Sequence, residues 1–279
     1  MVDLLGYLWD QTQAFMTWLM MWLLETLYGV TNSWGLAIIL LTVIVRIAMH
    51  PLTQKQMVSM QRMQKLQPRI KVLQNKYGDD KETLNREMMA LYKEEKVSPA
   101  AGCLPLLIQL PIFILLYRVL YNNDFAGATF LTVHLDGSVL TTMADALNLV
   151  DKAGVPIPRD QLGAVMVFFS SFTNLPLLFS NIGMWLPNMI LLILIAFLTW
   201  YQQHLSSAGN PQMAMMSWFM PLFLTFICIG LQGGVLLYWG VSSLMGVVHQ
   251  LRVMRKTDEE MRQKPVLLQE KPAKEKPLS

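Results

Sequence analysis

The chain carries five long runs of apolar residues, separated by polar or charged segments. They lie around 34–52, 103–122, 185–203, 217–232 and 234–250. Each run is close to the length that an α-helix needs to cross the roughly 30 Å hydrocarbon core of a bilayer. We therefore predict five transmembrane helices.

A sixth apolar run, 14–30, is also long enough to cross if its Glu25 is tolerated. A crossing would leave only residues 31–33 to connect it to the first predicted span. We therefore favour an amphipathic helix on the outer face of the membrane, where Trp18 and Trp22 would lie at headgroup level. A crossing helix remains the alternative.

A further apolar run, 163–180, is interrupted by polar residues and by Pro176. A crossing here would move the C-terminal tail to the other side of the membrane. We therefore expect 123–184 to form an outer segment, with a loop near 151–160 and an apolar hairpin that leans on the membrane surface.

Between the first two spans the apolar residues recur at three- and four-residue spacing, which is typical of amphipathic helices. The break is YGDD at 77–80, where the glycine can end one helix and the aspartates can cap the next. We predict an antiparallel helical hairpin. Pro68 is expected to bend its first helix, because proline lacks the amide that a helix interior uses.

Composition and charge agree with a membrane location. The chain is 53% hydrophobic and 15% charged, too few charges for a soluble globule of 279 residues. Of the 22 Lys and Arg residues, ten lie in 52–97 and eight follow Gln250. Because positive charge marks cytoplasmic segments, we expect the N-terminus outside and the C-terminus in the cytoplasm.

The predicted fold class is an all-α membrane protein with five transmembrane helices, a cytoplasmic antiparallel helical hairpin and an outer-face amphipathic N-terminal helix. The expected segments are an interfacial helix (1–33), first span (34–52), cytoplasmic hairpin (53–97), second span (98–122), outer segment (123–184), third span (185–204), cytoplasmic loop (205–216), fourth span (217–232), fifth span (233–250) and basic cytoplasmic tail (251–279).

Motifs of catalysis and metal binding are missing from the sequence. Cys103 and Cys228 match no CxxC or Cys/His ligand spacing, so we expect buried free thiols. The chain has no HExxH, no GxSxG and no paired intramembrane aspartates. We therefore predict neither an enzyme nor a bound metal or cofactor.

Arg46 is a charged residue inside the first predicted span, about 9 Å of helix rise from Leu52. An arginine near the middle of a span costs roughly 2.5–3.5 kcal/mol, so it needs polar partners, water or an escape route. Thr42 lies one turn away on the same face, and Gln109 offers an amide inside the second span. These residues suggest a polar site, although snorkelling of the arginine stem to the headgroups is the alternative.

Several segments resemble the YidC/Oxa/Alb family of membrane protein insertases. They are WGLAIILLTVIVR, PLTQKQMVSMQRMQKLQP, YGDDKETLNREMMALYKEEKVSP, GCLPLLIQLPIFILLYRVL and YWGVSSLMGVVHQ, in this order along the chain. The resemblance covers about 30–122 and 185–252. Its form is similar to the short, Gram-positive-like bacterial members, because no counterpart of a large periplasmic domain is seen. Gln232-Gly233-Gly234 departs from the family pattern, so the turn before the last span is expected to differ.

The resemblance implies an insertase or chaperone of a bacterial inner membrane. It implies that Arg46 faces a water-filled groove, closed to the outside and open to cytoplasm and lipid, and that Thr42, Gln109 and Trp239 line the same groove. Client segments are implied to enter this groove on their way into the bilayer. Nascent membrane proteins are the implied partners, and action beside the Sec translocon is left open.

The basic tail could bind the ribosome or anionic lipid, although membrane orientation explains its charge almost as well. The chief alternative function is a transporter or channel for an anionic substrate, because an intramembrane arginine can bind an anion. The sequence shows no second deep intramembrane charge and no inverted pair of broken helices, which such a protein would favour.

Overall fold

A computed structural model describes residues 2–95, 97, 104–122, 125, 127–149, 174–207 and 211–263. Within these ranges the chain is mostly helical, with one short β-hairpin. The helices are α1 (Val2–Thr31), α2 (Trp34–Lys65), α3 (Gln67–Tyr77), α4 (Lys81–Glu94), α5 (Leu104–Asn122), α6 (Val139–Ala146), α8 (Leu175–Ser180), α9 (Ile182–Ser207), α10 (Pro211–Cys228) and α11 (Gly233–Gln263).

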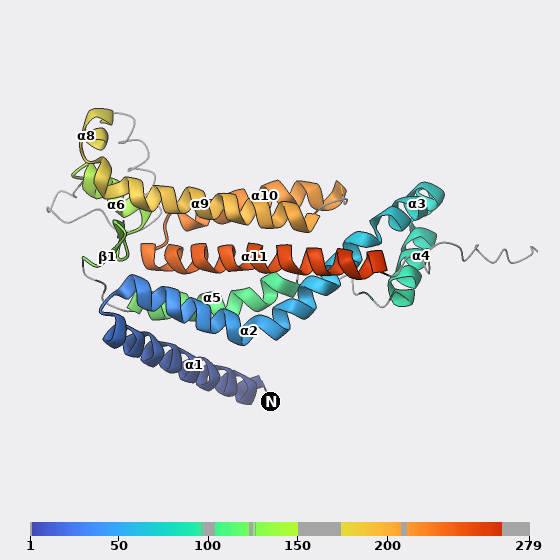
Figure 1. The fold of residues 1–279 in the computed structure, drawn as a ribbon, viewed down its shortest axis with the longest axis horizontal. Helices are drawn as coiled ribbons and strands as arrows, with labels where there is room; N and C mark the ends of the chain where they lie inside the picture. Colours follow the sequence, from blue (N-terminus) through green and yellow to red (C-terminus); the bar gives the residue numbers. More distant parts are fainter. Residues whose placement is uncertain are drawn as a thin grey trace, which may run out of the picture.

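Helix α11 lies at the centre of an elongated bundle (Figure 1). It packs against α2 and α9, α10 packs on α9, and α5 completes the side nearest α2. The hairpin α3–α4 extends from one end of the bundle, and α6, α8 and the β-hairpin gather at the other end. The bundle therefore has two chemically different ends joined by long helices.

Three helices are long and apolar enough to cross a membrane: α2, α9 and α11. Helices α5 and α10 carry shorter apolar segments, Gln109–Leu120 and Trp218–Cys228, within the described residues. The fold is thus a mostly helical membrane protein with three clear candidate spans. The count of five spans stays a prediction.

Helix α2 continues without interruption from the predicted first span into the predicted hairpin and ends only at Lys65. Pro51 lies inside this helix, where it leaves the carbonyl of Ile47 without its helical donor. Figure 1 shows α2 changing direction on its way to α3, as a proline inside a helix explains. The bend expected near Pro68 takes the form of a break: the chain turns at Leu66, and the proline lies in the first turn of α3, where its missing amide is tolerated.

The α3–α4 hairpin has the predicted break. Helix α3 ends at Tyr77 and α4 begins at Lys81. Asp80 caps α4, because its carboxylate accepts hydrogen bonds from the backbone amides of Glu82 and Thr83, each at 3.1 Å. The two helices share a small core, and Arg69 forms a 2.7 Å ion pair with Glu95 across them.

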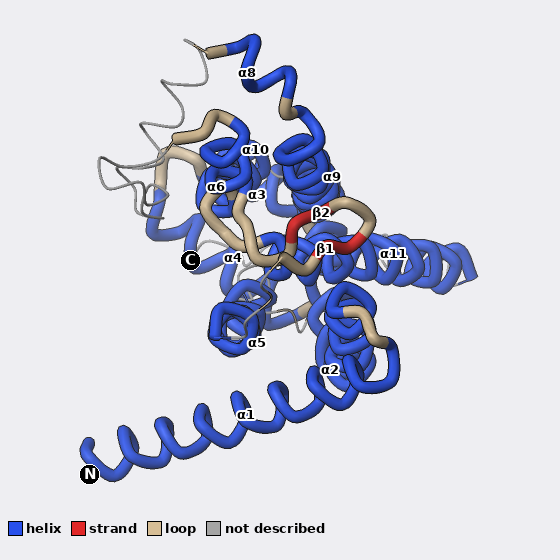
Figure 2. The backbone as a smooth tube through the Cα atoms, turned by 90° about the vertical axis from the view of Figure 1, so that its left-hand side faces the viewer, coloured by secondary structure: helices blue, strands red, loops and turns tan. Residues whose placement is uncertain are grey.

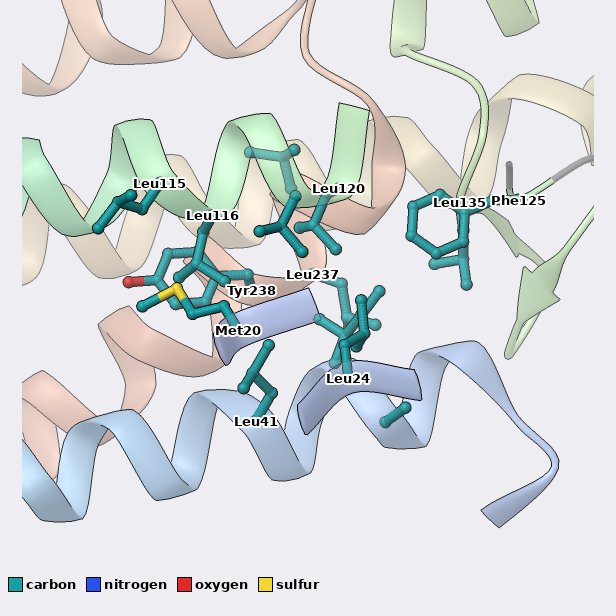
Figure 3. Close-up of a cluster of buried hydrophobic side chains, with 14 residues drawn as sticks. Met20, Leu24, Leu41, Leu115, Leu116, Leu120, Phe125, Leu135, Leu237 and Tyr238 are labelled. Atoms are coloured by element: carbon teal, nitrogen blue, oxygen red, sulfur yellow. The ribbon is translucent and has the colours of Figure 1, made fainter. Parts of the chain in front are cut away.

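Helix α1 packs against α2 and α5 and extends obliquely away from the bundle toward its N-terminus (Figure 2). Its Met20 and Leu24 enter the main core, together with Leu41 of α2 and Leu116 of α5 (Figure 3). Large apolar and aromatic side chains on its other face are exposed, Trp18 among them. An oblique helix with an exposed aromatic face suits the proposed interfacial position, which stays a prediction.

The end of the bundle opposite the α3–α4 hairpin is closed by a compact cap. Strands β1 (Thr129–Phe130) and β2 (Val133–His134) pair in antiparallel fashion, with Thr129 opposite His134. Asn188 of α9 is fully buried beneath this hairpin. Its Oδ1 accepts from the His134 amide at 2.9 Å, and its Nδ2 donates to the carbonyls of His134 and Gly137 at 3.0 and 3.1 Å.

The first residues of α11 complete this cap. The amides of Gly233 and Gly234 donate to the carbonyls of Gly137 and Leu135 at 2.8 and 2.9 Å. A Cβ atom at Gly233 would collide with the His134 carbonyl oxygen, so only glycine fits there. The Gln232-Gly233-Gly234 sequence therefore allows close contact between α11 and the loop that follows β2.

Some predictions concern residues outside the described ranges. These are the free thiol of Cys103, the loop near 151–160, the larger part of the apolar hairpin 163–180 and the tail beyond 263. Cys228 lies within them and is a buried free thiol, as predicted.

Candidate functional site

A polar cavity of about 220 Å³ lies between α2, α5, α9 and α11. It combines one arginine with neutral polar side chains, three methionines and aromatic rings. Its lining residues are Val45, Arg46, Met49, Thr53, Gln56, Met57, Met60, Gln109, Ile112, Thr199, Gln202, Ser206, Tyr238, Trp239, Ser242, Ser243 and Gln250. Arg46 is the one charged residue among them.

The Arg46 side chain is half-buried and reaches from α2 to α11. Its Nε donates to the Ser242 hydroxyl at 2.8 Å, and its Nη2 donates to the same oxygen. Among the described residues, no carboxylate lies within ion-pair distance of the guanidinium. The group therefore keeps a net positive charge and three further N–H donors that can serve water or a ligand.

Gln109 and Trp239 line the same cavity as Arg46. The Gln109 Nε2 donates to the Tyr238 hydroxyl at 3.1 Å and so joins α5 to α11. Trp239 packs edge-on against Phe113 of α5, with ring centroids 5.0 Å apart. These contacts hold an amide and an indole on the wall next to Arg46.

Thr42 lies one turn before Arg46 and is fully buried. Its hydroxyl donates to the Ile38 carbonyl of its own helix at 2.6 Å. Thr42 is not among the residues that line the cavity. Three of the four predicted site residues are thus brought together, and the fourth lies in the packed wall of α2.

The cavity continues past Arg46 toward the α3–α4 end of the bundle, where its wall is lined by glutamines and hydroxyl groups. The Gln250 Nε2 donates to the Ser206 hydroxyl at 3.0 Å, which ties α11 to α9. The Gln202 amide lies directly against Gly246, where a Cβ atom would approach its Nε2 to 3.0 Å. Small residues on α11 therefore leave space for polar side chains from α9.

Several buried polar atoms at this end have no hydrogen-bond partner within the described part of the chain. They include Gln56 Nε2, Thr199 Oγ1 and Gln250 Oε1. Buried polar atoms are normally paired, so atoms left free next to a cavity indicate bound water or ligand.

The partners of the Arg46 side chain were not predicted from the sequence. Ser242 and Tyr238 are one helical turn apart on α11 and face the cavity. Ser243 and Gln250, two turns apart, also line it. This polar stripe in the last apolar run is a signal that could have been read. The fact that it faces Arg46 depends on the packing of α11 against α2.

Metal ligation has no evident place here. Within the described residues, no three His, Cys, Asp or Glu side chains gather in one group. His50 and His249 stack face to face with ring centroids 4.6 Å apart, so their ring nitrogens do not converge on one point.

The fold and cavity define a multi-pass helical membrane protein with an arginine-containing polar cavity inside its bundle. The profile of the family described as "60Kd inner membrane protein" matches residues 26–260. The chain therefore belongs to this family, the YidC/Oxa1 family of the cell membrane.

The chain is also similar in sequence to individual proteins of this family. The chain is 33% identical over 257 residues to "Membrane protein insertase YidC" of Tolumonas auensis, covering 91% of this chain and 38% of the relative. It is 33% identical over 235 residues to the protein of that name in Nitratidesulfovibrio vulgaris, covering 84% and 37%. The chain thus spans less than two fifths of the length of these relatives.

A solved structure has a similar fold. It is described as an active YidC insertase crystal structure with the first transmembrane domain resolved. It is 27% identical in sequence, with a TM-score of 0.54, and the match covers 86% of this chain and 45% of that one. The likeness thus extends over most of this chain.

Proposed function

We propose that this protein is a membrane protein insertase that passes transmembrane segments and short polar tails of client proteins into the bilayer. The observation that carries the proposal is the half-buried Arg46 guanidinium, which faces a polar cavity and bonds to the neutral Ser242 hydroxyl. A charge at this depth costs roughly 2.5–3.5 kcal/mol unless it is solvated or paired. An arginine that is retained inside the bundle despite this cost indicates a functional site.

The proposed mechanism depends on solvation. A polar client segment enters the cavity from the cytoplasm and meets water, hydroxyls and amides at a depth that would otherwise be hydrocarbon. Acidic side chains in that segment are attracted to Arg46, and the attraction is stronger there than in bulk water because the local dielectric constant is lower. The apolar part of the client then moves into lipid, and no covalent bond changes.

We propose that Arg46, Gln109 and Trp239 contact the client and that Thr42 supports the α2 wall of the groove. The Gln109–Tyr238 hydrogen bond and the Phe113–Trp239 contact support this assignment, because they fix the amide and the indole beside the arginine. The three cavity methionines suit varied apolar clients, since their side chains are flexible and polarizable.

The proposed orientation has the N-terminus outside and the C-terminus in the cytoplasm of a bacterial inner membrane. The clustering of Lys and Arg in 52–97 and after Gln250 supports it. Nascent membrane proteins are the proposed partners, together with membrane lipids. The basic tail is the proposed contact for the ribosome, and the Sec translocon is a further candidate partner.

The alternative of an anion transporter or channel needs a continuous route to the outer side. The buried Asn188 network and the contacts of Gly233 and Gly234 argue against such a route, because they pack α9, α11 and the outer loop together at that end. We therefore favour the insertase.

The test uses purified protein in vesicles and a pair of clients that differ only in having an acidic or a neutral translocated tail. We expect Arg46→Ala to lower insertion of the acidic client about tenfold or more and to affect the neutral client less. Arg46→Lys keeps the charge but loses the guanidinium fork, so it should retain most activity. Thermal unfolding of each variant, measured in parallel, controls for misfolding.

Two results would contradict the proposal. If Arg46→Ala inserted the acidic client at the parental rate, the arginine would be only a snorkelling anchor. If the parent inserted neither client and instead passed small anions across the vesicle membrane, the protein would be a channel or transporter.

A further inference from the structure

The glutamines at the cytoplasmic end of the cavity are not explained by a need to solvate Arg46. Gln56 of α2 and Gln250 of α11 are almost completely buried, with exposed fractions of 5% and 2%. Both line the same cavity as Arg46. Each has one amide atom without a partner among the described residues, namely the Nε2 donor of Gln56 and the Oε1 acceptor of Gln250.

Leaving buried polar atoms unpaired is costly, because each group gives up its hydrogen bonds with water and gains none in the protein. A free donor on the α2 wall and a free acceptor on the α11 wall are the complement of a peptide group, which offers one C=O and one N–H. The two amides are uncharged, so they discriminate little between acidic, basic and neutral side chains of a bound chain.

The distance of Gln56 and Gln250 from the Arg46–Ser242 pair indicates which residues of a bound client segment they would contact. Gln56 lies ten residues after Arg46, or about 15 Å along α2, and Gln250 lies eight residues after Ser242, or about 12 Å along α11. An extended polypeptide advances about 3.3 Å per residue. About four client residues would therefore span the distance between the two positions.

We propose that Gln56 and Gln250 form a main-chain subsite that hydrogen-bonds peptide groups of an extended client segment, about four residues from the client side chain that faces Arg46. This subsite rests on the proposed insertase function and adds a site for the client backbone to the site for client charge. Arg46 responds to client charge, whereas the glutamine pair holds any client backbone in an extended form while it enters the groove.

Water is the competing occupant of these amides, and backbone methylation of the client separates the two cases. N-methylation removes the peptide N–H, and it thereby lowers the cost of transferring the client tail out of water. If the amides bind only water, a methylated tail should insert as fast as the unmodified tail or faster. If the amides bind the backbone, methylation should slow insertion.

The experiment uses the full chain in vesicles and a client with a neutral translocated tail, unmodified or N-methylated at three successive residues. For the parent, we expect methylation to lower the insertion rate two- to tenfold, the range that loss of one neutral hydrogen bond gives. Gln250→Leu removes the free acceptor that would bind the client N–H, so it should lower insertion of the unmodified client by a similar factor and abolish the effect of methylation. Gln56→Leu removes the donor that would bind the client C=O, so it should lower insertion of both clients and leave the effect of methylation in place.

Gln61 provides a matched control. It is also a buried glutamine of α2, 4% exposed and with unpaired amide atoms, but it does not line the cavity. Gln61→Leu should therefore leave both insertion and the methylation effect unchanged. A second readout uses a client that carries a photoreactive residue four positions from an acidic residue. We expect this photoreactive residue to crosslink to the protein at or next to Gln56.

The proposal is overturned if methylation leaves the parental rate unchanged or raises it, which would mean that the amides hold only water. It is also overturned if Gln61→Leu slows insertion as much as Gln56→Leu, because the effect would then be one of packing. Either result, obtained with a parent that still inserts acidic clients in an Arg46-dependent way, leaves the insertase function intact. A parent that inserts no client at all would instead refute the function itself.

Discussion

Asn188 offers the sharpest test of how the β-hairpin end of the bundle is closed. In Asn188→Ala, the His134 amide loses its acceptor, and the His134 carbonyl loses a donor. The Gly137 carbonyl keeps the Gly233 amide at 2.8 Å, so it loses less. Two groups left unpaired cost about 1–3 kcal/mol each, so we expect a loss of about 2–6 kcal/mol in stability. For a chain of this size that corresponds to a fall in the melting temperature of roughly 5–15 °C.

The free thiol of Cys228 supplies the assay, because it is 1% exposed and becomes reactive when the bundle opens. We would follow its labelling by a fluorogenic maleimide during heating, with Cys103 replaced by serine so that one thiol reports. Asn181→Ala is the control, since the Asn181 side chain makes one 2.8 Å hydrogen bond, to the Ala146 carbonyl. Its loss leaves one buried group, the Ala146 carbonyl, without this donor and should cost about 1–3 kcal/mol, half of the cost of the two groups left by Asn188→Ala. Equal melting temperatures for the two variants would refute the reasoning.

Three further predictions concern the hairpin and the topology. Hydrogen bonds from the Thr83 side chain and backbone lower the pKa of Asp80, so the cap stabilises α4 above the ordinary carboxyl pKa and is lost as the pH falls through the lowered value. Protection of the amides at the start of α4, measured as their exchange rate relative to the intrinsic rate at the same pH, should therefore fall below about pH 4 in the parent. Asp80→Asn, which also caps helices, should remove that pH dependence. Replacing 67–95 by a short linker keeps the α2 wall of the cavity, so we expect normal membrane integration but loss of client insertion; a parental insertion rate would reduce the hairpin to a connector. A single cysteine at Lys65 should be labelled from the cytoplasm and one at Lys152 from outside, and labelling of both from the same side would refute the orientation.

The sequence alone determined the features that depend on neighbouring residues. Apolar runs, the YGDD break and the cap at Asp80 are local signals, because helix formation and capping involve residues within one or two turns. Arg46 was recognisable because a charge inside an apolar run is costly wherever the helix packs. The resemblance to the insertase family also followed from short contiguous motifs.

Only the tertiary structure decided which polar groups meet. Ser242 is 196 residues from Arg46, and no local pattern predicts that their side chains bond. Thr42 had the right spacing for the groove, yet its hydroxyl is satisfied by the Ile38 carbonyl, because a buried threonine on a helix can bond its own backbone. The pairing of Gln250 with Ser206, and the free amide atoms beside that pair, depend on how α2, α9 and α11 pack. The physical reason is that periodicity tells which face of a helix is polar, whereas the neighbour of that face is set by side chains far away along the chain.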